Sequence, residues 1–278
     1  EEVTASLSHL NLSVFMDGQE LKEMLTSESG RTQAVQQIVG EVSKTYSQIG
    51  RNPYEGVTID FEGLRAPQKE AFLDFLRQLQ PALQKLDKKL LVCVPPVLTT
   101  SAYYDGYDYR AIGELADRVI LMAYGYGPQN MTGFTGTEYY KTAATTPVAS
   151  VYTALKYAVS EIAPSKLLLG FSAASTAWKI DENGKLVSET PVYPSNETVI
   201  KRLSQSDTEH GWSQTYQQSY AIYRTEDGSC YFLWYQDASS VQAALNAARL
   251  LGVNGVSVWR IGSIPDVNAV WSWSELLN

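Results

Sequence analysis

Short apolar segments recur along the chain, and most are followed by residues whose apolar positions repeat with helical spacing. The segments "LNLSVFM", "GVTIDFE", "KLLVCVPP", "RVILMAYGYG", "KLLLGFSAA" and "GVSVWRIG" predict strands. The intervening residues predict helices, including 31–49, a helix opened by Pro67, one over 151–162 and one just before residue 255. This alternation, with strands that are apolar on both faces, predicts a parallel sheet covered by helices.

Two architectures fit this alternation, a doubly wound open sheet and a (β/α)8 barrel. No G-x-G-x-x-G or G-x-x-x-x-G-K-[ST] motif follows a predicted strand, which removes support for a nucleotide-binding open sheet. Polar and aromatic residues gather at the C-terminal ends of the strands, where barrel enzymes place their sites: Glu62, Tyr124, Tyr126 and Trp259. The pattern favours an α/β fold of the (β/α)8 TIM barrel type. Because six of the eight strands are visible, either the first two βα units are lacking, or another chain supplies them, or the barrel interpretation is wrong.

Residues 175–236 interrupt the alternation with many aromatic residues and two hairpin signals. The Asn-Gly pair in "DENGKL" and the Asp-Gly pair in "EDGS" favour type I′ turns. We expect a small β-rich insertion between the last two barrel strands that forms one wall of a cleft. Its aromatic side chains could build a small core, stack against carbohydrate, or do both. The predicted divisions are 1–174 for the first five strands, 175–236 for the insertion, and 237–278 for the last helix and strand.

The composition limits the classes of partner. A chain of 278 residues with 44% apolar and 19% charged residues can bury a large core and is not typical of disordered proteins. Its net charge of −8 argues against nucleic acid or an anionic membrane surface as a partner. There is no run of 18 apolar residues, so no membrane span is expected, and "EEVTASLSHL" does not resemble a signal peptide.

Cysteine and histidine each occur twice, as Cys93, Cys230, His9 and His210. Two cysteines do not form a disulfide framework, so the redox compartment stays open. Cys93 lies in the apolar segment "LLVCVPP" and is expected to be a buried free thiol. Two histidines without a surrounding motif argue against a histidine-based zinc site and against a Ser-His-Asp triad. We expect neither a metal nor a cofactor.

Two carboxylates stand in one predicted strand, "EGVTIDFEGL", over residues 55–64. Asp60 and Glu62 alternate with apolar residues, so they share one strand face about 7 Å apart. Burying two nearby carboxylates is costly. One interpretation is that the acids only cap the end of a strand beside a helix start. The other is acid catalysis, because neighbouring carboxyl groups separate their pKa values, and a carboxyl that stays protonated near neutral pH can help to cleave a glycosidic bond.

The same strand resembles the D-G-x-D-x-D-x-E signature of glycoside hydrolase family 18. Further segments follow in that family's order: "YDYRAIGELADRVILMAY", whose Met122 and Tyr124 match an M-x-Y element, then "KLLLGFSAA", "FLWYQDASSVQAAL" and "GVSVWRIG" with Trp259. The resemblance spans about residues 10 to 262 and is most similar to bacterial spore cortex-lytic members, which act on the glycan strands of peptidoglycan. It implies that "LNLSVFM" is barrel strand three, that the first two βα units are lacking, and that residues 175–236 are an α+β insertion between strands seven and eight.

The resemblance also implies a retaining mechanism at N-acetylglucosamine in β-1,4-linked glycans, in which the N-acetyl oxygen of the substrate attacks its own anomeric carbon. Carried over residue by residue, Glu62 is the general acid and then the base, and Asp60 orients and polarises the acetamido group. Tyr124 would hydrogen-bond the acetamido carbonyl, and Trp259 would form the floor under the sugar in the −1 subsite. Without the resemblance, Tyr124 could be an ordinary rim hydroxyl and Trp259 a barrel-core aromatic.

This sequence departs from the family pattern at three positions. Glu55 replaces the first Asp of the signature, and Thr58 replaces the second, so position 58 can hydrogen-bond Asp60 but cannot share a proton with it. The Asp that often follows the tyrosine of the M-x-Y element is Gly125 here, and Tyr126 could compensate. The predicted substrate-binding residues are Trp259, Tyr126, Met122 and Thr58.

We expect a glycosidase that acts on peptidoglycan or chitin-like glycans and has an N-acetylated glycan as its partner. The expected location is outside the cell or at the spore or cell wall of a bacterium. A non-catalytic or weakly active glycan-binding protein is the alternative, which Thr58 and Gly125 favour, whereas the presence of Glu62 favours the enzyme. A barrel scaffold without sugar chemistry is a third possibility. The sequence does not predict the oligomeric state.

Overall fold

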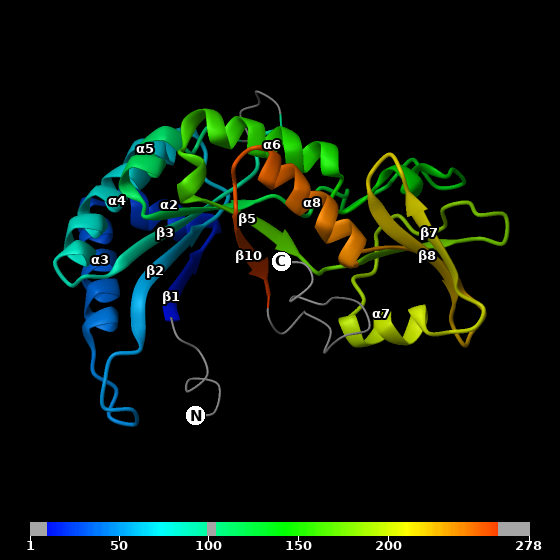
Figure 1. Ribbon diagram of the computed structural model, residues 1–278, viewed down its shortest axis with the longest axis horizontal. Helices are drawn as coiled ribbons and strands as arrows, with labels where there is room; N and C mark the ends of the chain where they lie inside the picture. Colours follow the sequence, from blue (N-terminus) through cyan, green and yellow to red (C-terminus); the bar gives the residue numbers. More distant parts are fainter. Residues whose placement is uncertain (1–9, 99–103, 261–278) are drawn as a thin grey trace. The chain divides into compact units, whose positions relative to one another are not determined.

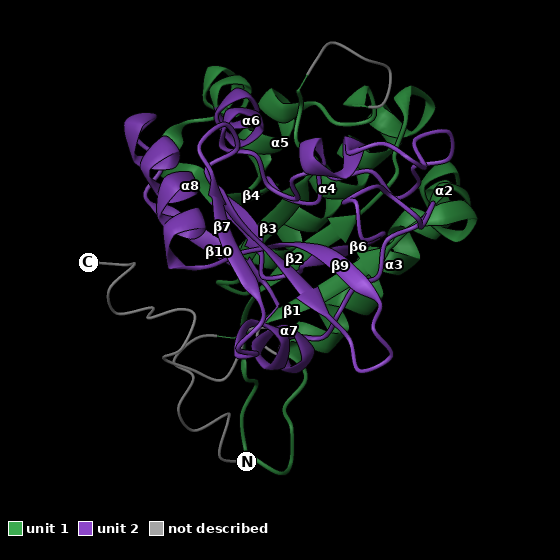
Figure 2. Cartoon of the chain, turned by 90° about the vertical axis from the view of Figure 1, so that its right-hand side faces the viewer, with its two compact units in different colours: residues 1–122, 156–168 green, residues 123–155, 169–278 purple. Residues whose placement is uncertain are grey.

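The computed structural model describes residues 10–98 and 104–260 (Figure 1). The chain divides into two compact units, which are coloured separately in Figure 2. Unit 1 takes residues 1–122 and 156–168, and unit 2 takes residues 123–155 and 169–278. Unit 1 holds the first four parallel strands and unit 2 holds the antiparallel sheet, and each unit contains some of the predicted site residues.

Unit 1 is a parallel sheet with helices along one face (Figure 1). Its four strands pair in sequence order and are β1 (Leu10–Met16), β2 (Tyr54–Phe61), β3 (Lys89–Val94) and β4 (Arg118–Met122). The helices between them are α2 (Gly18–Thr26), α3 (Glu28–Ser43), α4 (Lys69–Gln84) and α5 (Tyr109–Leu115). These strands match the first four predicted segments, and the parallel pairing confirms the predicted α/β class.

Helix α4 shows why the sheet is covered on this side. Its buried face consists of apolar residues three or four positions apart: Phe72, Phe75, Leu76, Leu79 and Leu83. Burying side chains of this kind stabilises the fold by about 1.5–3 kcal/mol each. Pro67 lies in the short 3-10 turn Ala66–Gln68 that leads into the helix, as predicted. Leu86 lies beyond the helix end and is 38% exposed.

Two other helices differ from the prediction. The helix predicted over 31–49 ends at Ser43, because the backbone then folds into a tight turn in which the Gly50 amide donates to the Tyr46 carbonyl at 2.8 Å. Helix α2 was not predicted at all. It has nine residues and only one group of apolar residues at helical spacing, of which Leu21 and Leu25 are fully buried, so the prediction overlooked it.

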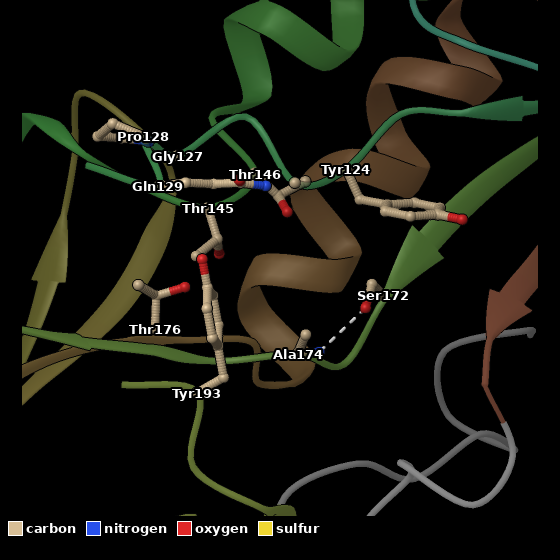
Figure 3. Close-up of a pocket in the computed structure, with 11 residues that line it drawn as sticks. Tyr124, Gly127, Pro128, Gln129, Thr145, Thr146, Ser172, Ala174, Thr176 and Tyr193 are labelled. Atoms are coloured by element: carbon tan, nitrogen blue, oxygen red, sulfur yellow. Dashed lines mark hydrogen bonds between the residues drawn. The ribbon is translucent and has the colours of Figure 1, made fainter. Parts of the chain in front are cut away.

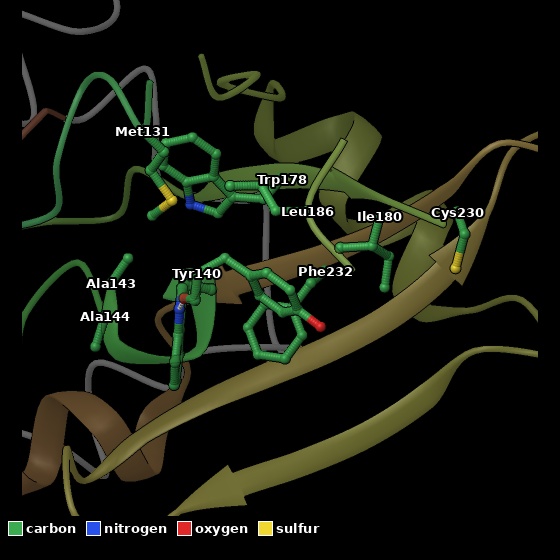
Figure 4. Packing of buried hydrophobic residues seen from close by; sticks show 10 residues of the cluster. Met131, Tyr140, Ala143, Ala144, Trp178, Ile180, Leu186, Cys230 and Phe232 are labelled. Carbon is green, nitrogen blue, oxygen red and sulfur yellow. Dashed lines mark hydrogen bonds between the residues drawn. The ribbon is translucent and has the colours of Figure 1, made fainter. Parts of the chain in front are cut away.

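Unit 2 contains a four-stranded antiparallel sheet in the order β6-β9-β8-β7. Its strands are β6 (Thr176–Ile180), β7 (Glu209–Ser213), β8 (Gln218–Arg224) and β9 (Cys230–Tyr235), and helix α7 (Asn196–Leu203) lies between β6 and β7 in the sequence. Trp178, Phe232 and Trp234 pack with Tyr140 and Met131 in a buried cluster on one face of the sheet (Figure 4). Much of the aromatic content of residues 175–236 therefore forms a small core.

Both predicted hairpin signals lie at turns, but not of the predicted type. In the first turn the Gly184 amide donates to the Asp181 carbonyl at 3.0 Å, and in the second the Gly228 amide donates to the Thr225 carbonyl at 2.8 Å. A type I′ turn needs positive φ at two central residues. Here Gly184 and Gly228 have φ of +70° and +82°, whereas the residues just before them do not have positive φ. A single left-handed glycine is typical of longer hairpin loops.

The remaining elements complete the alternation that the sequence predicts. They are α6 (Val148–Glu161), β5 (Leu167–Ser172), α8 (Ala238–Leu250) and β10 (Gly255–Trp259). The parallel strands have the hydrogen-bonded order β1-β2-β3-β4-β5-β10. The absence of the first two βα units, and the boundaries 1–174, 175–236 and 237–278, stay predictions. Of the helices that the structure describes, none has the length and apolar character of a membrane span.

Candidate active site

The two predicted catalytic acids lie at the C-terminal end of β2. Asp60 is the second-last residue of the strand, and the amide of Glu62, just beyond it, donates to the Met16 carbonyl of β1 at 2.9 Å. The apolar residues that alternate with them in β2 are buried beneath the sheet. Asp60, Glu62 and the deeper Thr58 therefore share the other face. Asp60 is only 7% exposed, whereas Thr58 and Glu62 are partly buried.

The environment of Glu62 favours its protonated form. Burial raises the pKa of Glu62, and the negative charges of Asp60 and then Asp17 raise it further. Burial also raises the pKa of Asp60, while a hydrogen bond from the Cys93 thiol lowers it. Glu62 thus keeps its proton to a higher pH than a free glutamic acid, which a general acid needs.

Asp60 is not fully satisfied by the protein. Its Oδ1 atom is buried and has no hydrogen-bond partner within residues 10–98 and 104–260. A buried carboxylate oxygen without a donor is costly, and such atoms are enriched at functional sites. On the neighbouring strand β1, Phe15 pairs in register with Asp60 and is 53% exposed. The acidic face of β2 is therefore flanked by an accessible aromatic ring.

The predicted site residues are divided between the two units. Met122 ends β4 in unit 1, which also holds Thr58, Asp60 and Glu62. Unit 2 holds Tyr124 and Tyr126, which follow β4 in the chain, and Trp259, the last residue of β10. Tyr124 and Tyr126 are partly buried, and Trp259 is 50% exposed. The structure thus gathers Thr58, Asp60 and Glu62 on one strand face, and places the tyrosines and the tryptophan at the ends of strands, as the sequence predicts.

Unit 2 has a pocket of about 280 Å³ that Tyr124 helps to line (Figure 3). The exposed Tyr193 reaches toward Thr145 and Thr176 from the opposite side. The other lining residues are mostly small or polar: Gly125, Gly127, Pro128, Gln129, Thr146, Ser172 and Ala174. Two tyrosine rings with hydroxyl and amide groups around them give a mixed aromatic and polar lining, which is typical of small-molecule sites.

A buried glutamine fixes one wall of this pocket. Gln218 of β8 is fully buried, and its side-chain oxygen accepts a hydrogen bond from the Thr146 amide at 2.9 Å. Its side-chain nitrogen donates to the Thr145 hydroxyl at 2.5 Å and to the Tyr235 carbonyl at 3.3 Å. These bonds tie the loop that carries Thr145 and Thr146 to the antiparallel sheet, so this wall is held by the core of unit 2.

The glycine at position 125 has a structural reason. Gly125 lines the pocket and has φ of +72°, a left-handed conformation that costs most other residues roughly 1–2 kcal/mol. A Cβ atom there would have no neighbour within 4 Å, so space does not exclude a larger residue. The backbone conformation therefore suits glycine, but it does not exclude the aspartate that the family often has here, since aspartate adopts this conformation more readily than most residues.

Sequence reasoning missed three groups near the candidate site. Cys93 is a buried free thiol, as predicted, but its hydrogen bond to Asp60 was not foreseen. Asp17 and Tyr193 were not singled out, although Asp17 raises the pKa of Glu62 and Tyr193 lines the pocket of unit 2. Strand register could have found Cys93, because it lies on the β3 face that adjoins Asp60. Nothing local in the sequence marks Asp17 or Tyr193.

No cluster of three or more metal-ligating side chains occurs among the residues that the structure describes. His9 lies outside these residues, and His210 is an exposed residue of strand β7. The side chains described at the candidate site carry carboxyl, hydroxyl, thiol, amide and aromatic groups.

Comparisons with known proteins identify relatives of this chain and structures with a similar fold. The cortical fragment-lytic enzyme of Bacillus subtilis is 26% identical over 220 residues, which cover 76% of this chain and 47% of that protein. The crystal structure of the spore cortex-lytic enzyme SleL of Bacillus megaterium superposes with a TM-score of 0.74 at 23% identity, over 92% of this chain and 57% of that one. The structure of a family 18 N-acetylglucosaminidase of Paenibacillus barengoltzii superposes with a TM-score of 0.70 at 18% identity, over 92% of this chain and 79% of that one.

The chain spans about half the length of the curated relatives it matches. The model of the family "Glycosyl hydrolases family 18" matches residues 9–263, nearly the whole chain. That range includes both acids of β2, the tyrosines that follow β4, and Trp259. The chain therefore belongs to glycosyl hydrolases family 18, in the branch that contains the spore cortex-lytic enzymes.

Proposed function

We propose that this chain hydrolyses glycosidic bonds at N-acetylglucosamine in peptidoglycan, with Glu62 as the general acid and then the base. The observation that carries the proposal is the pair of acids on one face of β2. Asp60 is buried next to Glu62, and its charge helps to raise the pKa of Glu62. A glycosidase needs such a carboxyl to protonate the leaving oxygen near neutral pH.

Asp60 supports a substrate-assisted reaction. Its buried Oδ1, without a donor in the described residues, can accept a hydrogen bond from the acetamido N–H of a bound sugar. That bond would orient the acetamido group so that its carbonyl oxygen attacks the anomeric carbon. The glycosidic C–O bond then breaks, and its electron pair and the proton of Glu62 go to the leaving oxygen. Water next attacks the anomeric carbon and gives its proton to Glu62, which restores the acetamido group and retains the configuration.

The residues of unit 2 support a glycan as the substrate. Tyr124 and Tyr193 present aromatic rings beside hydroxyl groups in one pocket, and Trp259 exposes half of its surface. Aromatic faces pack well against the apolar faces of sugar rings. In the proposal Tyr124 hydrogen-bonds the acetamido carbonyl and Trp259 forms the floor of the −1 subsite. Tyr126, Met122 and Thr58 are the further substrate-binding residues.

The relatives suggest the substrate and the location. Two of them are enzymes of the spore cortex, by their names, and a third is a family 18 N-acetylglucosaminidase. We therefore propose peptidoglycan with N-acetylated sugars as the substrate, with β-1,4 linkages cleaved. The proposed place of action is outside the cell or at the spore or cell wall.

The matched test uses two oligosaccharides that differ only in acetylation, a chito-oligosaccharide and its de-N-acetylated form, together with purified peptidoglycan. We expect product from the acetylated oligosaccharide and from peptidoglycan, and a loss of at least about 10²-fold in rate without the acetyl group, because the internal nucleophile is then missing. Equal rates on both oligosaccharides would contradict the substrate-assisted mechanism.

A glycan-binding protein with little or no activity is the second candidate, and two positions favour it. Thr58 and Gly125 are neutral where the family signature often has carboxylates. Saturable binding of the acetylated oligosaccharide without any product would support this candidate over the enzyme. If no saccharide were bound at all, a scaffold without sugar chemistry would be the better account.

A further inference from the structure

We propose that Cys93 is a positioning residue of the acid pair, whose thiol holds the Asp60 carboxylate in place and leaves Oδ1 directed to the substrate. The register of β2 and β3 pairs Thr58 with Leu91 and Ile59 with Val92, so Asp60 and Cys93 come next along the two strands. Both side chains are 7% exposed. The thiol donates a hydrogen bond to the Asp60 carboxylate.

The thiol can act only as a neutral donor. Burial, the charge of Asp60 and their hydrogen bond all raise the pKa of Cys93, and the charge of Glu62 raises it further. Among the described residues, Cys93 on β3 acts on Asp60, while Asp60 and Asp17, just before α2, act on Glu62, just beyond β2. Burial opposes a charge on Asp60 by raising its pKa, and Cys93 is the neighbour whose hydrogen bond lowers that pKa.

This role matters because the usual partner of Asp60 is missing. The family signature has an Asp where this chain has Thr58, one inward position deeper than Asp60. A second acid would share a proton with Asp60, whereas a thiol donates its own proton and favours the ionised carboxylate. Cys93 thus keeps Asp60 charged and oriented by another route. The consequence for catalysis rests on the proposed function, but the hydrogen bond itself does not.

The test measures the titration of Asp60 directly. The full chain is labelled with ¹³C at the aspartate side-chain carboxyl groups, and Asp60→Asn assigns the Asp60 signal. The variants Cys93→Ser and Cys93→Ala form a matched pair, since they differ only by one hydroxyl that can donate. The other buried cysteine, Cys230 in unit 2, supplies the control variant Cys230→Ser. Cys93→Thr and Cys93→Val repeat the comparison with better filling of the space, in case the smaller residues destabilise the sheet.

We expect the Asp60 titration midpoint to rise by about one pH unit in Cys93→Ala, since one hydrogen bond to the charged form is lost. The Asp60 midpoint in Cys93→Ser should stay closer to that of the unmodified chain, and Cys230→Ser should leave the midpoint unchanged. Equal midpoints in the serine and alanine variants, or in the threonine and valine variants if the smaller ones unfold, would overturn the proposal.

Kinetics then separate positioning from structure. With the acetylated oligosaccharide we expect Cys93→Ala to lower kcat more than it raises KM, and Cys93→Ser to recover most of kcat. A loss of kcat in Cys93→Ala that Cys93→Ser does not recover would show that the thiol serves packing alone. If the unmodified chain shows no turnover, the proposed function fails, but the titration still decides whether Cys93 holds Asp60.

Discussion

The protonation of Glu62 depends on a few neighbouring residues. Burial and the charges of Asp60 and Asp17 favour its acid form, and Cys93 favours the charge on Asp60 that contributes to this effect. Asp60 raises the pKa of Glu62 only while it is ionised, although its own burial disfavours the charge. The same residues supply the first two predictions.

The first prediction concerns the pH dependence of activity. Asp60→Asn removes the negative charge that raises the pKa of Glu62, so Glu62 should lose its proton at a lower pH. The alkaline limb of kcat/KM should then move to lower pH, in addition to a fall in the maximum rate. A pH series with the acetylated oligosaccharide measures both changes. Asp17→Asn should shift the alkaline limb less, because the Asp17 charge raises the pKa of Glu62 less than the Asp60 charge does. An unmoved alkaline limb in Asp60→Asn would mean that Glu62 is not the titrating acid.

The second prediction concerns stability. The folded-state pKa of Asp60 is raised above its unfolded value of about 3.9, so its contribution to stability is present below that pH and is lost as the pH rises through the folded pKa. At pH 7 the ionised Asp60 thus destabilises the fold. We expect Asp60→Asn to raise Tm at pH 7 and to give a much smaller difference near pH 3. Thermal unfolding at the two pH values checks this, and a lower Tm at pH 7 would show that Asp60 stabilises the fold.

The elements were predictable where their signal is local. Strand β2 and helix α4 follow from apolar spacing within one segment, and their positions agree with the prediction. Helix α2 was missed because it is short and buries few residues, and the end of α3 is set by a turn with Tyr46 and Gly50. The partners of the acids were not visible, because they depend on which strands pair and in what register.

The third prediction concerns Gly56 at the start of β2. A Cβ atom at Gly56 would lie 2.4 Å from the Lys89 carbonyl oxygen and 2.6 Å from Oδ1 of Asn11, so the strands β1 and β3 leave no room for it. Gly56→Ala should lower the free energy of unfolding, by an amount of the order of 1–3 kcal/mol that is typical of overpacking. Gly40→Ala is the control, since Gly40 is exposed in α3 with nothing within 4 Å, and alanine there should stabilise the helix by about 0.5–1 kcal/mol.

Chemical unfolding of the two variants decides the third prediction. Opposite changes in stability are expected, because the two glycines differ in the space around them and not in their chemistry. If Gly56→Ala were as stable as the unmodified chain, the close approach of β1, β2 and β3 at this point would be wrong.

On the scale of the whole molecule, the predicted acids lie in unit 1, whereas Tyr124, Tyr126 and Trp259 belong to unit 2. The fourth prediction tests whether the molecule recognises the acetamido group. Glu62→Gln should bind the acetylated oligosaccharide without consuming it, and a ligand at 100 times its Kd stabilises a protein by about 2.7 kcal/mol. We expect a clear rise in Tm with this ligand and little with a glucose oligosaccharide of equal length. The same rise with both would argue against acetamido recognition.

The most direct test of the account is the rate of hydrolysis by Glu62→Gln. The substitution keeps the shape of the side chain and removes the proton that the reaction needs. With acetylated chito-oligosaccharide and with peptidoglycan, we expect kcat to fall by about 10²–10⁴ or more, which is the size of a general acid's contribution. Tm should not fall, because the pKa of Glu62 is raised in the folded protein and its charge at neutral pH therefore opposes folding. A variant that keeps most of the activity of the unmodified chain would contradict the assignment of Glu62 and with it the proposed mechanism.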